Sequence, residues 1–259
     1  MNATTRILVL AAFFLGAIGL ASWVYFQSAP ATAESNTETV ESGPQPIDAE
    51  SLDPAMRAGL DAIAEDRIDE AIAQFQQVPA DSPQHLEAMQ QLGVLYTREG
   101  RFEEAANVLL RLTAMAPDSA EAHALLGWVL HLGGRPRDAE ISALRALELN
   151  PNHLASRYNI ALYRVAQGRS QEAIASYIRA MNVDPNAAEI VKHRDRLAQY
   201  TEQNDEKPAP HYALAFFANS MQDRDLEIKE LERFLELVSG GPEADTARER
   251  LAAAQASAQ

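Results

Sequence analysis

The chain of 259 residues carries 37 acidic and 22 basic side chains, which gives a formal net charge of −15. This acidity argues against a nucleic acid partner, because proteins bind nucleic acid mainly through Lys and Arg on phosphates. The chain has no cysteine, which excludes disulfides, thiolate metal sites, cysteine nucleophiles and a cysteine-linked lipid anchor. Its hydrophobic content of 47% suffices for a packed core, and the abundance of Ala and Leu favours an all-α fold.

An apolar run occupies residues 7–26, where Ser22 is the only polar residue. As a helix, this run is about 30 Å long, the thickness of the hydrocarbon core of a bilayer. Arg6 precedes the run, and residues 27–50 contain acidic side chains but no Lys or Arg. This charge asymmetry predicts a single-pass anchor in a bacterial inner membrane, with the C-terminal body in the periplasm.

A cleaved signal peptide is the alternative for residues 1–26, because Ala31-Thr32-Ala33 fits the small-x-small cleavage pattern. The apolar run is longer than the usual signal-peptide core of about 7–15 residues, which favours the retained anchor. Residues 27–50 are rich in Ser, Thr, Pro, Ala and Glu and bury too little apolar surface to fold. They are predicted to form a flexible linker with an end-to-end distance of about 25–30 Å.

A regular repeat runs through the next part of the chain, and its prolines recur at equal intervals from Pro83 to Pro185. Recurring glycines suit the turn between two helices, recurring alanines suit a close helix crossing, and the prolines end each unit. Asp66 takes the glycine slot in the first unit. The recurring residues are Gly100, Gly134 and Gly168; Ala71, Ala105, Ala139 and Ala173; and Pro83, Pro117, Pro151 and Pro185. Such a period predicts stacked helix pairs.

This pattern resembles the tetratricopeptide repeat (TPR) family, and the second unit carries the likeness best, with Leu92, Gly93, Tyr96, Gly100, Phe102, Ala105 and Pro117. Two slots depart from it: Ala143 replaces the second-helix aromatic of the third unit, and Arg164 replaces the first-helix aromatic of the fourth. The resemblance implies a helix-turn-helix solenoid with a right-handed superhelix, in which residues 51–187 form four units.

The register is lost beyond Pro185. Residues 187 to about 201 are predicted to form a helix, and a diverged helix pair and a last helix are predicted to follow. Residues 188–259 are therefore expected to form degenerate TPR-like helices and a C-terminal cap.

Catalytic and cofactor motifs are missing from the sequence, which has no HExxH, Walker or GxGxxG pattern. We therefore expect no enzyme activity, no metal and no cofactor. The alternative is an enzyme or metal carrier that uses His123 and His131.

The resemblance to TPR proteins implies a concave groove, lined by the first helix of each unit, that holds a peptide or helix of another protein. The groove slots are mostly apolar and lack the Lys, Arg and Asn that would grip a terminal carboxylate. An amphipathic helix or hydrophobic segment is therefore the expected partner, with Trp128 and Tyr158 as anchors. Alternatively, these side chains pack against the superhelix or its cap. The expected groove residues are Met56, Leu60, Ile63, Gln90, Val94, Thr97, Trp128, His131, Tyr158 and Leu162, with Ala124 and Val165 in the same register.

The expected function is that of a non-catalytic protein–protein interaction scaffold or adaptor of the bacterial cell envelope. The alternatives are a self-associating scaffold that forms homo-oligomers, and an assembly or chaperone factor for c-type cytochrome maturation, export or pilus and secretion machinery. The sequence does not choose among these pathways.

Overall fold

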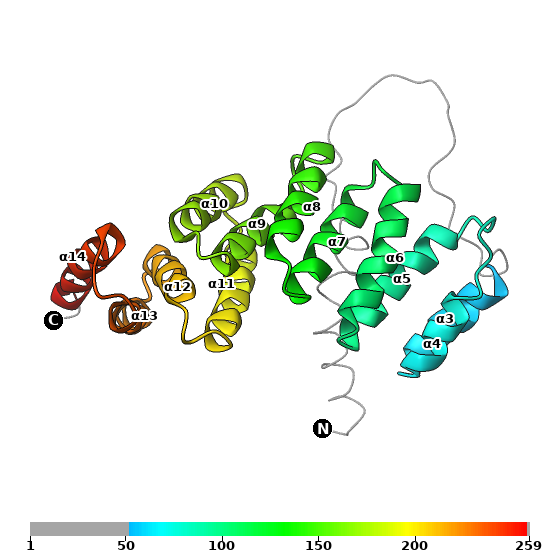
Figure 1. The fold of residues 1–259 in the computed structure, drawn as a ribbon, viewed down its shortest axis with the longest axis horizontal. Coiled ribbons are helices and arrows are strands. Elements are labelled where there is room, and N and C mark those ends of the chain that lie inside the picture. The colour runs from blue at the N-terminus through cyan, green and yellow to red at the C-terminus, as the bar shows by residue number, and fades with distance from the viewer. Residues whose placement is uncertain (1–51, 258–259) are drawn as a thin grey trace, which may run out of the picture. The chain divides into compact units, whose positions relative to one another are not determined.

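The computed structural model describes residues 52–257, which fold into helices without a strand in this range (Figure 1). The predicted anchor or signal peptide and the predicted linker, residues 1–50, lie outside the described residues. Among the described helices, none combines the length and apolarity needed to cross a membrane. The all-α prediction is confirmed for the described part of the chain.

Four helix pairs form the first part of the described chain. In each pair, the first helix leads through a short turn into a second helix that packs against it. The pairs are α3 (Pro54–Ala64) with α4 (Ile68–Phe75), α5 (His85–Arg98) with α6 (Phe102–Met115), α7 (Ala120–Leu132) with α8 (Pro136–Leu149), and α9 (Leu154–Ala166) with α10 (Ser170–Val183).

The turns within these pairs use the backbone conformation that the recurring glycines predicted. Gly100, Gly134 and Gly168 have φ of 71°, 75° and 76°, a region that is accessible to glycine without steric cost. Asp66 adopts φ 58° in the same slot of the first pair. Aspartate is one of the few other residues that tolerate this region, so the first unit keeps the turn without a glycine.

The alanines Ala71, Ala105, Ala139 and Ala173 are all fully buried at the crossing of the two helices in a pair. The third pair is packed differently from the first, because Ala143 stands where Phe75 stands in the first pair. A Cβ atom on Gly59 would meet the Phe75 ring, whereas one on Gly127 would lie 2.9 Å from the carbonyl oxygen of Ala139. With no large side chain between them, α7 and α8 pack backbone against backbone.

An arginine stands immediately before the second helix of every pair and forms an ion pair with an acidic residue three positions on. The acidic residue lies in the first helical turn, where it also offsets the partial positive charge of the helix N-terminus. This feature was not predicted from the sequence, although it recurs with the period of the repeat. The ion pairs are Arg67–Glu70, Arg101–Glu104, Arg135–Asp138 and Arg169–Glu172.

Four further helices follow: α11 (Ala187–Glu202), α12 (Pro208–Ser220), α13 (Arg224–Leu237) and α14 (Pro242–Ser257). The sequence predicted that the register is lost beyond Pro185, and the helix spacing is interrupted there. One repeat period after Leu154, the start of α9, falls at position 188, whereas α12 begins at Pro208. From there the spacing resumes, because the start of α14 at Pro242 lies one period beyond Pro208.

Helix α12 packs against α9 and α10, as the first helix of a following unit does, and Gln222 repeats the turn conformation with φ 61°. Helix α11 is therefore an insertion between two consecutive units. Figure 1 shows it in yellow, between α9 and α12.

Candidate protein-binding groove

The first two units keep most of their predicted groove side chains partly accessible. Leu60, Ile63, Gln90, Val94 and Thr97 are half-buried, whereas Met56 is fully buried. The Thr97 hydroxyl donates to the carbonyl oxygen of Gly93 at 2.6 Å, so its polar group is satisfied within α5. Among the predicted groove residues of these two units, the partly accessible side chains are therefore mostly aliphatic, with the Gln90 amide as a polar group.

Side chains of α11 cover the predicted groove residues of the third and fourth units. The His193 imidazole stacks on the Tyr158 ring, with centroids 3.9 Å apart and planes inclined by 7°. The Arg196 guanidinium lies 4.8 Å from the centroid of the Trp128 ring. The Tyr200 ring lies 5.6 Å from the His131 ring, which also contacts Trp128. Two ring–ring contacts and one cation–π contact thus join α11 to first helices.

An apolar cluster continues this interface beyond the aromatic contacts. Leu197 of α11 is fully buried in one cluster with Tyr158, Leu162 and Val165 of α9. Phe217 of α12 belongs to the same cluster.

The structure therefore places His131, Tyr158 and Leu162 inside the folded chain and leaves Trp128 half-buried. Ala124 is buried as well. That a partner binds at these residues stays a prediction.

The two histidines of the interface are held in their neutral form. Burial, with a smaller contribution from the nearby Arg196 charge, lowers the pKa of His193 to about 3 and that of His131 to about 4. Arg196 itself donates from Nη1 to Asn159 Oδ1 at 3.1 Å. The guanidinium therefore provides the positive charge of this interface at neutral pH, because arginine stays protonated in proteins.

Several polar atoms at this interface have no hydrogen-bond partner among the described residues. They are Nδ1 of His131 and the hydroxyl oxygens of Tyr158 and Tyr163. Buried polar atoms are almost always paired in folded proteins, so these three atoms stand out among the side chains of the interface.

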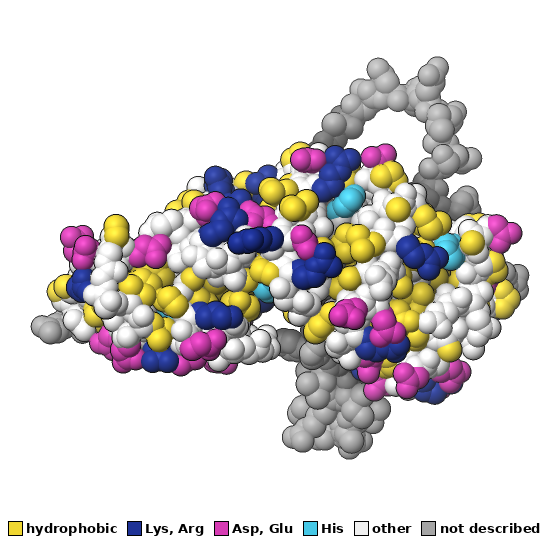
Figure 2. Space-filling model, viewed as in Figure 1, with side chains coloured by type: hydrophobic (Ala, Val, Ile, Leu, Met, Phe, Trp, Pro, Cys, Tyr) yellow, Lys and Arg dark blue, Asp and Glu magenta, His cyan; other side chains and the backbone are white. Residues whose placement is uncertain are grey.

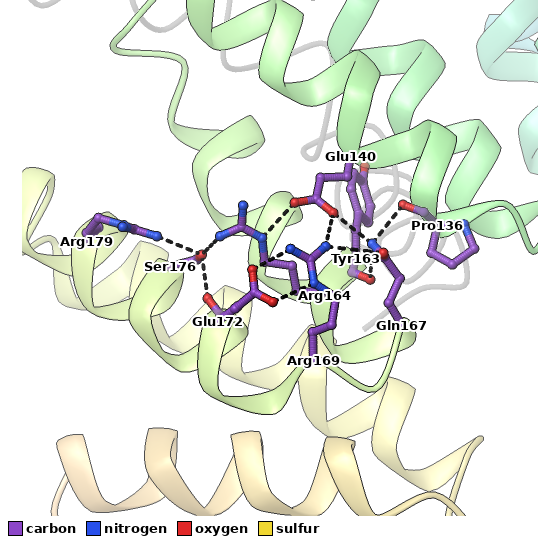
Figure 3. Close-up of polar contacts among 9 residues, drawn as sticks. All are labelled: Pro136, Glu140, Tyr163, Arg164, Gln167, Arg169, Glu172, Ser176 and Arg179. Carbon is purple, nitrogen blue, oxygen red and sulfur yellow. Dashed lines mark hydrogen bonds and ion pairs between the residues drawn. The ribbon is translucent and has the colours of Figure 1, made fainter.

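Arg164, the residue that departs from the repeat pattern, lies in a polar network that joins α8, α9 and α10 (Figure 3). Its Nε donates to Glu140 Oε1 at 2.7 Å, and its Nη1 donates to Ser176 Oγ at 2.6 Å. Glu140 also accepts from Gln167 at 2.9 Å and from Arg169 at 2.6 Å. The network holds the third unit against the fourth.

Although burial alone would raise it, the hydrogen bonds from Gln167 and Arg164 hold the pKa of Glu140 below its ordinary value. Glu140 pairs with Arg164 and Arg169, and Arg169 also pairs with Glu172, so these charges are paired within the network.

The two histidines of the alternative metal-carrier hypothesis make separate contacts. His123 Nε2 lies 3.1 Å from the carbonyl oxygen of Pro117, and His131 lies among the rings of Trp128, Tyr163 and Tyr200. Within residues 52–257, the His, Asp and Glu side chains form no group of three that is suited to hold a metal ion.

The structure brings together four residues that were not predicted from the sequence: His193, Arg196, Leu197 and Tyr200. Their spacing of i, i+3, i+4 and i+7 is a detectable signal, since it places all four on one helix face.

Helix pairs in a regular register, each packed on the next and with first helices along one side, define a helical-repeat solenoid, a class of protein-interaction fold. The sequence model of the tetratricopeptide repeat family matches residues 62–129 and again residues 154–187. These two stretches of the chain therefore contain tetratricopeptide repeats.

Solved structures with a similar fold include a crystal structure of MamA, which is 20% identical, with a TM-score of 0.49 over 69% of this chain and 93% of that one. Another is TTC0263, a thermophilic TPR protein in Thermus thermophilus. It is 20% identical, with a TM-score of 0.45 over 78% of this chain and 97% of that one. No curated protein matches the sequence.

Proposed function

We propose that this chain is a non-catalytic scaffold that binds another protein along the first helices of its first two units. The observation that carries the proposal is the contrast in exposure along the repeat. Leu60 and Val94 are half-buried, whereas Leu162, in the same slot of the fourth unit, is buried beneath α11. The first two units thus leave partly accessible the slot that Leu162 fills in the fourth unit.

The partner is an amphipathic helix or a hydrophobic segment. Leu60, Ile63 and Val94 supply aliphatic contact area, and Gln90 supplies one amide for a hydrogen bond. The groove slots of these units contain no Lys, Arg or Asn to hold a terminal carboxylate. Apolar burial therefore provides most of the binding free energy, and binding should respond only weakly to salt.

We place this scaffold in the envelope of a bacterium, with residues 7–26 as an inner-membrane anchor and the repeats in the periplasm. The support is the charge asymmetry around the apolar run. Arg6 precedes the run, and all charged side chains in residues 27–50 are acidic. Maturation of c-type cytochromes, export, and pilus or secretion-system assembly are the candidate pathways.

The proposed orientation can be tested with reporters fused after Gln259. A reporter that is active only in the periplasm should be active, whereas activity of a cytoplasm-only reporter would reverse the proposed orientation.

The binding test is an in-cell crosslinking pull-down with the full chain, read by mass spectrometry. The groove variant carries Leu60→Ala and Val94→Ala. The matched control carries Ile141→Ala and Val183→Ala, which truncate aliphatic side chains that are 66% and 49% exposed on second helices. We expect partners to be lost in the groove variant and kept in the control. Equal recovery from both, with helical content unchanged by circular dichroism, would refute the groove as the binding site.

A second candidate function, self-association into an oligomeric scaffold, is favoured by a row of exposed aliphatic side chains. Leu110, Leu144 and Ile178 share one slot of consecutive second helices and are 48%, 41% and 39% exposed. On the face shown in Figure 2, hydrophobic side chains lie among acidic and basic ones at the surface. Sedimentation of the full chain across a concentration series should show a rising mass that Leu144→Lys abolishes. A constant monomer mass would exclude this function.

A further inference from the structure

The repeat architecture does not require α11. Helices α12, α13 and α14 continue the repeat spacing once residues 187–206 are passed, and α12 already packs against α9 and α10 as the next first helix. In a solenoid each unit is stabilised mainly by its neighbours, so units four and five stack without the inserted segment. The role of α11 must therefore be sought in what it covers.

Helix α11 lies on the groove as a bound ligand helix would. His193, Arg196, Leu197 and Tyr200 follow the i, i+3, i+4, i+7 spacing by which an amphipathic helix anchors in a hydrophobic groove. Their polar and aromatic contacts go to first-helix side chains: His193 to Tyr158, Arg196 to Trp128 and Asn159, and Tyr200 to His131. In units three and four, the contacts to Trp128 and His131 cover slots whose equivalents in the first two units remain partly accessible.

Helix α11 is also less deeply buried than α12, the helix that packs as the next first helix. Of its described side chains, three are buried, namely His193, Leu197 and Thr201, whereas α12 buries nine. The groove beneath it keeps the unpaired His131 Nδ1 and Tyr158 hydroxyl described above. A helix that covers the groove but leaves such atoms unpaired is suited to replacement by one that supplies the missing partners.

We propose that α11 is an intramolecular occupant of the groove of units three and four, and that a partner protein displaces it with an amphipathic helix of the same pattern. The pattern is a ring at i, a cation at i+3, an aliphatic side chain at i+4 and a second ring at i+7. The proposal rests on the proposed function in one respect, namely that first helices bind protein partners. It adds where a helical partner binds and what competes with it.

The test uses a fluorescein-labelled peptide of residues 187–202 as the probe, titrated against the full chain. The release variant, His193→Ala with Arg196→Ala and Tyr200→Ala, removes three contacts but keeps Leu197. The matched control, Asp195→Ala with Gln199→Ala and Glu202→Ala, truncates three exposed positions of the same helix.

A tethered occupant competes at a high effective concentration, so we expect the probe to bind the release variant at least about ten-fold more tightly than wild type or control. Equal affinity for all three chains, or no binding to any, would overturn the proposal.

Hydrogen exchange on the wild-type full chain tests the same idea without a substitution. We expect the amides of α11 to exchange through a local opening, while those of α9 and α12 stay protected. If α11 exchanges only together with α9 and α12, it is a fixed part of the core, and the proposal is wrong. The pull-down with the Leu60 and Val94 variant reports on the first two units, so a failure there leaves the result for α11 intact, and the reverse also holds.

Discussion

Removing the carboxylate of Glu140 should destabilise the contact between the third and fourth units. The substitution is Glu140→Ala, which leaves Arg164 without its 2.7 Å partner although the Arg164 side chain is only 15% exposed. Breaking a fully buried ion pair from one side costs about 3–5 kcal/mol. Arg164 keeps its bond to Ser176 and Arg169 keeps its bond to Glu172, so we expect a loss of about 2–3 kcal/mol.

The assay is thermal unfolding of the full chain followed by circular dichroism. A loss of this size should lower the melting temperature by about 5–10 °C for a folded body of this length. Glu104→Ala is the matched control, since Glu104 is an exposed carboxylate paired with Arg101, and it should lower the melting temperature far less than Glu140→Ala does. If Glu140→Ala melts together with the control, the network does not hold the two units together.

The pH dependence provides a second readout for Glu140. Because its pKa is lower in the folded chain than in the unfolded one, its contribution to stability is present above the unfolded value of about 4.3. The contribution is lost as pH falls through the lowered folded pKa. The difference in melting temperature between wild type and Glu140→Ala should therefore be largest near neutral pH and shrink below about pH 4. A difference that does not change with pH would show that the loss comes from packing and not from the charge.

Three further predictions concern other buried groups. The pKa of His193 is lowered by burial to about 3, so protection of α11 from hydrogen exchange should fall as pH drops from about 6.5 towards 4; equal protection at both ends would contradict this. Although burial alone would lower it, the 2.6 Å contact with Glu230 raises the pKa of His211, so Glu230→Gln should lower stability to urea more at pH 6 than at pH 9. Gly127→Ala should cost about 1–3 kcal/mol in the same urea assay, because its Cβ would press on backbone, whereas Gly240→Ala, in open space, should cost almost nothing.

The sequence was sufficient to predict those parts of the fold that each repeat unit determines by itself. The turn conformation at Gly100, Gly134 and Gly168 and the burial of the crossing alanines follow from one residue and its slot. Arg164 could not be explained in this way, because its partner Glu140 belongs to the preceding unit. Only the folded chain shows that these two charged side chains compensate each other across the interface between the two units.

The candidate site was predicted only in part for a similar reason. The first-helix slots were found from the register, but their accessibility depends on α11, which begins at Ala187, close to the register position 188, and yet is not the helix that packs as the next first helix. Residues 187–201 were predicted to be helical, yet periodicity along the chain carries no information on which face of the solenoid an inserted helix will cover. The start of α12 at Pro208, well beyond the register position 188, was the detectable sign that an extra helix precedes the next helix pair.

The inserted segment can be removed without changing the spacing of the repeat. Deleting residues 187–206 would join α10 to α12 through Asp184, Pro185, Asn186 and Lys207, a link as long as residues 150–153 provide between α8 and α9. The shortened chain would therefore keep an unbroken repeat spacing from α3 to α14. A natural relative without this segment would have the same stack of helices and an uncovered Trp128 and Tyr158, so gain or loss of one block of sequence would separate two binding behaviours on a single scaffold.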